Sequence, residues 1–114
     1  MCSRLSSRAL RHAVVFLVAS LSIGCGTVRN PSLERARDAY QRARQDPLIV
    51  RNAGAALDRA QLTLEAAERL WNEERDVNEV DHLAYIAEKR VEIARVTAQR
   101  RQAAEEIRQG AARP

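Results

Sequence analysis

The feature that most constrains the fold is a row of small apolar residues at alternating intervals of three and four in the C-terminal third of the chain. Seven residues keep this spacing for three heptads: Val77, Val80, Ala84, Ala87, Val91, Ala94 and Ala98. Leu83 and Ile93 widen the row. An average spacing of 3.5 residues places the row on one stripe of an α-helix that packs against other helices. The sequence therefore predicts a long helix over residues 77–109.

Two earlier segments carry the same spacing over shorter lengths. In the segment 31–45 the apolar positions are Leu33, Ala36, Tyr40 and Ala43, and in the segment 54–74 they are Leu57, Ala60, Leu64, Ala67 and Trp71. Alanine fills much of each row, which lets helix backbones approach closely. The sequence predicts an all-α fold: a three-helix antiparallel (up-down-up) bundle, or a coiled-coil-like hairpin with a long third helix.

Helix boundaries are marked by capping residues and prolines. Asn30-Pro31 predicts a helix start, because Asn accepts from free N–H groups and Pro suits the first helical position. Asp46-Pro47 predicts a break, with residues 48–50 either starting a new turn or packing as a connector, and regular helix only from about Gly54. The segment 76–79 (Asp-Val-Asn-Glu) predicts a capping box, with Asp76 as the cap and Glu79 reaching back.

The end of the third helix departs from the apolar row. Beyond Ala98 the next positions of the row are Arg101 and Glu105. We therefore expect the last turns to project from the bundle, either solvated or against a partner, and residues 110–114 to form a disordered tail.

The first 24 residues have the layout of a secretory signal peptide. Three arginines precede an apolar run of 11 residues, Ala13 to Ile23, which is too short to cross a bilayer. The run ends in Leu21-Ser22-Ile23-Gly24-Cys25, which resembles a bacterial lipobox with Ser22 where Leu is usual. The resemblance implies cleavage between Gly24 and Cys25, lipidation of Cys25, and a tether over residues 25–30.

This resemblance also implies a location. Residue 26 is Gly and not Asp, which in Gram-negative lipoproteins favours the periplasmic face of the outer membrane. Two or more acyl chains on one cysteine give stable membrane attachment. The alternatives are ordinary secretion with a free Cys25 and an uncleaved N-terminal anchor; the short apolar run argues against the anchor.

Composition excludes several classes of function. The chain has 19 basic and 15 acidic residues, but three of the arginines lie in the leader, which leaves 16 basic and 15 acidic residues after it. Acids and bases are interspersed and aromatic residues are 4%, so the sequence does not indicate nucleic-acid binding. Past Cys25 there is no cysteine for a disulfide or metal site, and we expect no metal and no cofactor.

Four residues of the third helix are candidates for a partner surface: His82, Tyr85, Lys89 and Arg101. His82 beside Asp81 lacks a nucleophile on the same face and three further metal ligands, so we interpret it as a structural helix residue and expect no enzyme. Tyr40 and Trp71 fall on the apolar rows and are interpreted as core. Tyr85 lies just off the row and is the better surface candidate.

The third helix also carries a family resemblance. Its segment 80–94 (VDHLAYIAEKRVEIA), with Leu33, Ala36, Tyr40, Asp46-Pro47 and Leu57 before it, resembles a helical domain of unknown function in Gram-negative lipoproteins. In that family the domain often precedes an OmpA-like domain. We expect none here, since the sequence stops at Pro114, so the resemblance implies neither peptidoglycan binding nor catalytic residues.

The sequence leaves two functions open. The first is a non-catalytic structural or interaction module that meets an envelope protein or another copy of itself. The second is a binding module for peptidoglycan or a small envelope ligand through the exposed face of the third helix.

Overall fold

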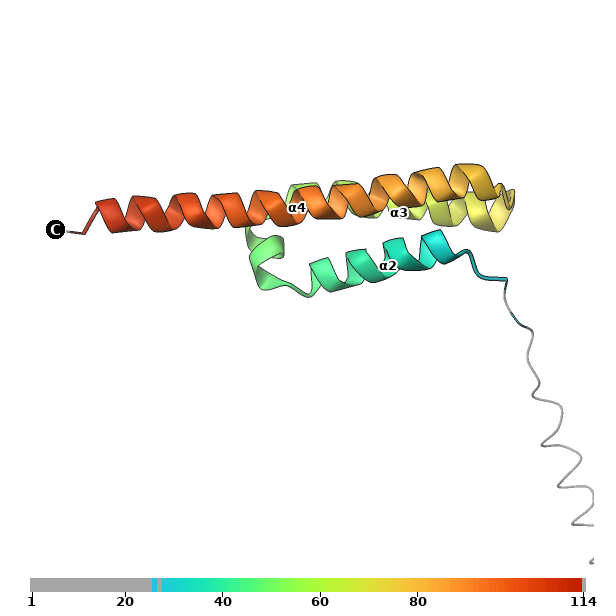
Figure 1. The fold of residues 1–114 in the computed structure, drawn as a ribbon, viewed down its shortest axis with the longest axis horizontal. Helices are drawn as coiled ribbons and strands as arrows, with labels where there is room; N and C mark the ends of the chain where they lie inside the picture. The colour runs from blue at the N-terminus through green and yellow to red at the C-terminus, as the bar shows by residue number, and fades with distance from the viewer. Residues whose placement is uncertain (1–25, 27, 114) are drawn as a thin grey trace, which may run out of the picture.

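The computed structural model describes Gly26 and residues 28–113, and this part of the chain forms three α-helices and no strand. They are α2 (Pro31–Arg44), α3 (Pro47–Glu73) and α4 (Val77–Ala111). α2 and α4 run in one direction, α3 runs in the opposite direction, and each helix contacts both others, so the predicted three-helix, up-down-up arrangement is confirmed (Figure 1). The leader, with Gly24 and Cys25, lies outside the described residues.

Each helix begins at a polar cap. The side chain of Asn30 accepts from the backbone N–H of Leu33 at 2.9 Å, and Asp76 accepts from that of Glu79 at 3.1 Å. These caps satisfy N–H groups that have no partner inside the helix. Both starts were predicted, although the second bond of the capping box, from the Asp76 N–H to the Glu79 side chain, is not formed among the described residues.

The predicted start of the second helix was wrong. α3 begins at Pro47 and not near Gly54, because Asp46 accepts from the N–H of Leu48 and Pro47 takes the first helical position. Of the two alternatives for residues 48–50, the structure has the new turn, because they belong to the start of the helix. The sequence predicted regular helix only from about Gly54, and the helix is irregular just before this residue, with a kink at Ala53 (φ −141°, ψ 31°). The short segment before the kink, Pro47–Asn52, forms an elbow between α2 and the straight part of α3 (Figure 1).

The core is one seam of small residues divided into two clusters. The first surrounds the α3–α4 turn and holds Leu33, Ala36, Leu64, Ala67, Val80, Ala84 and Ala87. The second lies beside the elbow and holds Ala43, Ile49, Ala53, Leu57, Ala60, Val91, Ala94 and Ala98. We call the bundle around the first cluster the turn half (residues 28–38 and 61–88) and that around the second the elbow half (residues 39–60 and 89–102).

The predicted apolar rows match this seam closely. All their members are buried except Tyr40 and Trp71, which are partly buried against it, and Val77, which is 52% exposed. Ile93 was expected to widen the row but is 58% exposed. Both exceptions have a geometric cause: Val77 is the first residue of α4, before the helices meet, and Ile93 lies on the far side of α4 from Val91 and Ala94.

α4 extends past the bundle, as expected. After Ala98 every described residue is exposed except Glu105, which is partly buried. The helix nevertheless continues to Ala111, two residues beyond the predicted end, with Gly110 inside it. We call residues 99–111 the overhang; it projects past the elbow in Figure 1.

Candidate interaction surface

Three of the four candidate residues lie on one side of α4. His82, Tyr85 and Lys89 are exposed, and their spacing of three and four places them on the face opposite the buried seam. The Tyr85 ring is 59% exposed. Arg101 does not join them, because its place in the helix is on the seam side.

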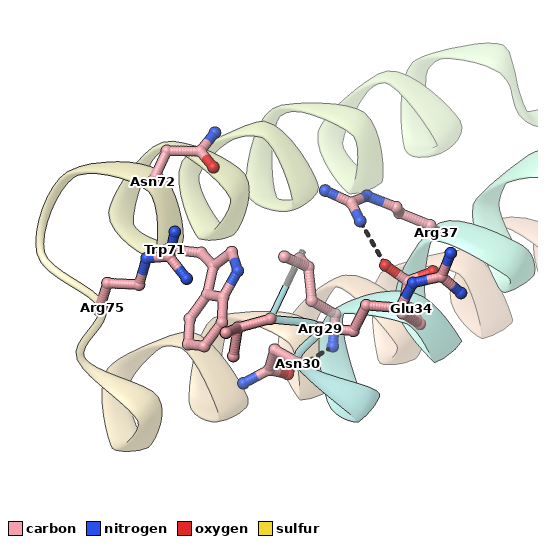
Figure 2. Close-up of a pocket in the computed structure, with 9 residues that line it drawn as sticks. Arg29, Asn30, Glu34, Arg37, Trp71, Asn72 and Arg75 are labelled. Atoms are coloured by element: carbon pink, nitrogen blue, oxygen red, sulfur yellow. Dashed lines mark hydrogen bonds and ion pairs between the residues drawn. The ribbon is translucent and has the colours of Figure 1, made fainter. Parts of the chain in front are cut away.

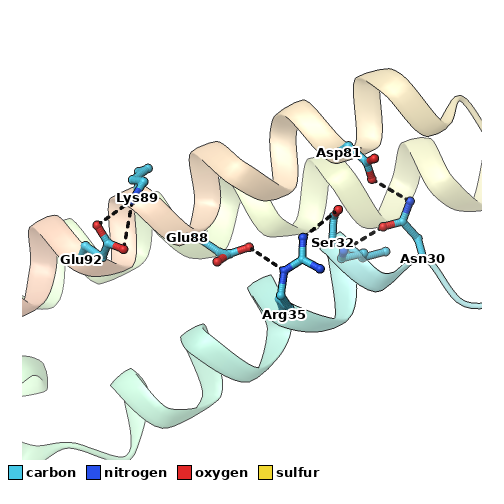
Figure 3. A network of polar contacts seen from close by, with 8 residues as sticks. Asn30, Ser32, Arg35, Asp81, Glu88, Lys89 and Glu92 are labelled. Carbon is cyan, nitrogen blue, oxygen red and sulfur yellow. Dashed lines mark hydrogen bonds and ion pairs between the residues drawn. The ribbon is translucent and has the colours of Figure 1, made fainter.

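Lys89 connects Tyr85 to an acidic neighbour. Its ammonium lies 5.5 Å from the centre of the Tyr85 ring and 3.0 Å from a carboxylate oxygen of Glu92. The hydrogen bond and the negative charge of Glu92 raise the pKa of Lys89. Figure 3 shows Lys89 and Glu92 as neighbours on α4, joined by this contact. The face therefore offers an aromatic ring with a cation held beside it.

Sequence reasoning missed three apolar residues on the same face. Ile93, Val96 and Ile107 are 58%, 43% and 73% exposed. Tyr85, Val96 and Ile107 belong to a row that we call the outer stripe, and Ile93 lies beside it. The outer stripe consists of Tyr85, Lys89, Glu92, Val96, Arg100, Ala103 and Ile107, all exposed. The signal was present in the sequence as a second row at intervals of three and four, offset from the buried one.

Arg101 forms a hydrogen bond from α4 to the elbow. Its Nη1 donates to the backbone carbonyl of Asn52 at 2.5 Å. That carbonyl precedes the kink at Ala53, where the regular helical hydrogen-bond pattern is interrupted. Arg101 thus supplies a donor from α4 to α3 at the point where α3 bends. The prediction that it serves a partner surface is untested, and its observed contact is within the bundle.

Charge is divided between the two halves of the bundle. The turn half has five basic and ten acidic residues, a net charge of −5, and the elbow half has nine basic and three acidic residues, a net charge of +6. Lys89 has the only ion pair of any elbow-half cation in the described part of the chain, with Glu92 of the same half. Acidic and basic residues are therefore separated between the two halves, and not evenly mixed over the bundle.

Polar contacts fix α2 against the turn half. The Asn30 side-chain amide donates to Asp81 at 3.0 Å, and Arg35 lies 3.8 Å from Glu88 (Figure 3). Arg37 donates to Glu68 on α3, and this hydrogen bond raises the pKa of Arg37. These contacts tie α2 to both other helices at the end where the chain enters the bundle.

A cavity of about 330 Å³ lies at this same end (Figure 2). Its wall includes Arg29, Asn30, Arg37, Trp71 and Arg75. Most of these groups have partners already: the Arg75 guanidinium lies 5.1 Å from the Trp71 ring centre, Asn30 bonds Asp81, and Arg37 bonds Glu34 and Glu68. The cavity is thus built from contacts that hold the bundle together.

Neither metal binding nor membrane crossing is visible in the described residues. They contain no group of three His, Cys, Asp or Glu side chains that could hold a metal ion. None of the described helices is both long and apolar enough to cross a membrane. His82 is exposed on α4.

Comparison with known proteins identifies a family. A family model described as a domain of unknown function (DUF4398) matches residues 31–109. No protein with a curated description and no solved structure is similar to the chain at a significant level. The match covers α2, α3 and α4 almost to the end of the overhang. The chain therefore belongs to this family, a domain of unknown function.

Proposed function

We propose that this protein is a non-catalytic helical interaction module of the bacterial cell envelope, held at the periplasmic face of the outer membrane by a lipid on Cys25. One observation supports the interaction role above others: a long, regular helix exposes Tyr85, Ile93, Val96 and Ile107 along the face turned away from its own core. Exposed apolar side chains that gather on one face are typical of protein contact surfaces.

The lipid anchor rests on the sequence of the leader. The basic start, the apolar run of 11 residues and the lipobox-like Leu21–Cys25 support cleavage before Cys25 and its acylation. Only a few residues then separate Cys25 from Asn30, which caps α2. The lipid would therefore hold the turn half of the bundle close to the membrane, since α2 starts there.

The anchor is tested by metabolic labelling with a fatty acid analogue in cells. The full-length chain is expected to take up the label and to sediment with outer membranes. Cys25→Ala is expected to lose the label and leave the membrane, whereas Cys2→Ala, the matched control in the leader, keeps both. A labelled Cys25→Ala protein would contradict the assignment of Cys25.

The interaction role is tested by photo-crosslinking in cells from Tyr85 and from Arg101. A crosslinked protein of defined mass from Tyr85 supports the proposal. Crosslinks from Arg101 alone would place the contact at the elbow. The absence of any crosslinked product from both Tyr85 and Arg101 would contradict the proposed interaction role.

A ligand-binding module is the second candidate. It is favoured by a shallow depression on α4 lined by Lys89, Glu92, Ile93, Val96, Thr97 and Arg100, which combines apolar and charged groups. Retention on purified peptidoglycan distinguishes the two. Tyr85→Ala and His82→Ala are expected to release the protein from peptidoglycan with unchanged helicity if this candidate holds.

A further inference from the structure

We propose that Arg59 and Arg90 bind a carboxylate side chain on an acidic segment of a partner protein. This inference rests on the proposed function, because it names the chemistry of the partner and the groups that hold it. Arg59 belongs to α3 and Arg90 to α4, and both are exposed. Together with Ala56 and Ile93 they line one depression of about 190 Å³.

The depression lies on the side of the α3–α4 pair that α2 leaves uncovered. α2 is tied to α4 through Glu88, which pairs with Arg35. Arg90 follows Glu88 by two residues, which turns it by about 200° around a helix of 3.6 residues per turn. The Arg90 side chain instead reaches α3, where its Nη1 donates to the backbone carbonyl of Arg59 at 3.3 Å. Both guanidinium groups are therefore accessible to a partner that approaches from the side opposite α2.

The Arg90 guanidinium is positioned before any partner binds. Besides the Arg59 carbonyl, its Nη1 donates to the hydroxyl of Thr63. That hydroxyl is fixed in turn, because Thr63 is 7% exposed and donates to the same carbonyl at 3.0 Å. A guanidinium has five N–H donors in a planar fork, and these bonds occupy only those of Nη1. Arg90 therefore offers its remaining donors to a carboxylate with little loss of side-chain freedom on binding.

Neither Arg59 nor Arg90 has a carboxylate partner within the part of the chain that the structure describes. The turn half differs, because there Arg37 pairs with Glu68 of a neighbouring helix. Like charges that share one depression repel each other, and a carboxylate from outside offsets this repulsion with charge-assisted hydrogen bonds. The counter-charge that the bundle supplies in its turn half is therefore left to a partner in the elbow half, whose net charge is +6.

Apolar residues beside the two arginines indicate what else the partner carries. Ile93 is 58% exposed and belongs both to this depression and to the one that Val96 and Arg100 line. The depression at the two arginines, about 190 Å³, lies below the range of about 300–1,000 Å³ typical of small-molecule pockets, and has room for one side chain. A protein segment with an acid next to apolar residues fits this arrangement, with its acid on the arginines and its apolar side chains on Ile93 and Val96. Peptidoglycan offers carboxylates but no large apolar side chain to cover Ile93.

Photo-crosslinking in cells from Ile93 of the full-length chain tests the proposal, with the crosslinked segment sequenced by mass spectrometry. The expected product is a segment of another envelope protein with Asp or Glu within a few residues of the crosslink. A segment without an acid, a second copy of this chain or a peptidoglycan fragment would each overturn the proposal. The absence of any product from Ile93 would overturn it as well, and products from Tyr85 would in that case leave the proposed interaction role intact.

The contribution of each arginine is measured by fluorescence anisotropy, with the crosslinked segment made as a peptide and the full-length protein purified in mild detergent. Arg59→Gln and Arg90→Gln are each expected to raise the dissociation constant about tenfold, with unchanged helicity in circular dichroism. Arg95→Gln is the matched control, because it removes the same charge from an exposed residue of the elbow half that lines neither depression, and it is expected to leave binding unchanged. Equal weakening by Arg95→Gln would show that net charge alone attracts the peptide, and unchanged binding by Arg59→Gln and Arg90→Gln would show that the acid binds elsewhere. Either result would overturn the proposal.

Discussion

The turn half and the elbow half of the bundle share one packing rule and differ in almost everything outside it. Both bury a seam in which alanine alternates with a few larger residues, such as Leu64 in the turn half and Leu57 in the elbow half. Their surfaces carry net charges of −5 and +6. The buried seam determines how the helices pack. The surface residues do not take part in this packing, so they can determine which molecules the bundle binds.

The two halves also differ in how their cores are bordered. In the turn half, Leu70, Trp71 and Leu83 lie partly buried beside the cluster, and in the elbow half two of the bordering residues are alanines, Ala39 and Ala56. The elbow half adds a kinked first turn of α3. We therefore expect the turn half to be the more rigid part of the bundle, because large side chains leave less room for rearrangement.

The largest expected effect is the loss of folding stability when one buried leucine from each half is replaced by alanine. Leu64→Ala is expected to lower the free energy of unfolding by about 3 kcal/mol, and Leu57→Ala by about 2 kcal/mol, although both side chains are 6% exposed. The cavity left at Leu57 can shrink, because it borders small residues and the kink. Urea unfolding followed by circular dichroism measures both values. An equal or larger loss at Leu57 would contradict the difference in rigidity.

The next largest effect is the loss of stability when a buried alanine of the seam is replaced by the larger leucine. Ala60→Leu in the elbow half and Ala67→Leu in the turn half are each expected to cost about 2 kcal/mol, because both residues are fully buried where helices meet. Ala55→Leu is the matched control on the exposed side of α3 and is expected to change stability by less than about 0.5 kcal/mol. Thermal unfolding of the three variants checks this; a neutral Ala67→Leu would show that the seam is loosely packed.

The seam could be predicted from the sequence because a helix repeats every 3.6 residues, and a row at intervals of three and four must lie on one face. The start of α3 could not, because Asp46-Pro47 is compatible both with a break and with a helix start. Ile93 was misassigned for a related reason. Apolar residues follow both the inner and the outer face of α4, and the spacing alone does not say which face is buried.

The candidate surface was predictable in part. Tyr85 and Lys89 were found because they lie off the buried row, and the structure places them together through the contact of the Lys89 ammonium with the Tyr85 ring. Arg101 was chosen because it takes the next position of the row beyond Ala98, where the helix was expected to leave the bundle, but its bond to Asn52 depends on the kink, which brings a carbonyl group from a distant part of the chain. The division of charge between the halves could have been seen in the sequence, because residues 61–88 hold eight acidic and two basic residues and residues 89–102 hold one acidic and five basic residues.

A smaller effect concerns the turn between α3 and α4. Arg75 has a positive φ of 57°, which is unfavourable for a residue with a side chain, and its guanidinium lies over Trp71. Arg75→Gly relieves the backbone and loses the ring contact, whereas Arg75→Ala loses the contact and keeps the unfavourable φ. We expect the glycine variant to be more stable than the alanine variant by about 1 kcal/mol in chemical unfolding. Equal stability would show that the turn carries no strain.

The smallest effect is at the elbow. Arg101→Ala removes the donor to the Asn52 carbonyl, and because this bond is exposed, water replaces it at a cost of about 0.5–1 kcal/mol. The loss is expected to be local, since the turn half has its own contacts to α2. Hydrogen exchange should become faster for the amides of residues 49–57 and stay unchanged in residues 64–73. Arg95→Ala, an exposed arginine of α4, is the matched control and should change neither segment. Faster exchange in both segments would mean that the two halves unfold as one unit, and the comparison between them would then describe surface charge alone.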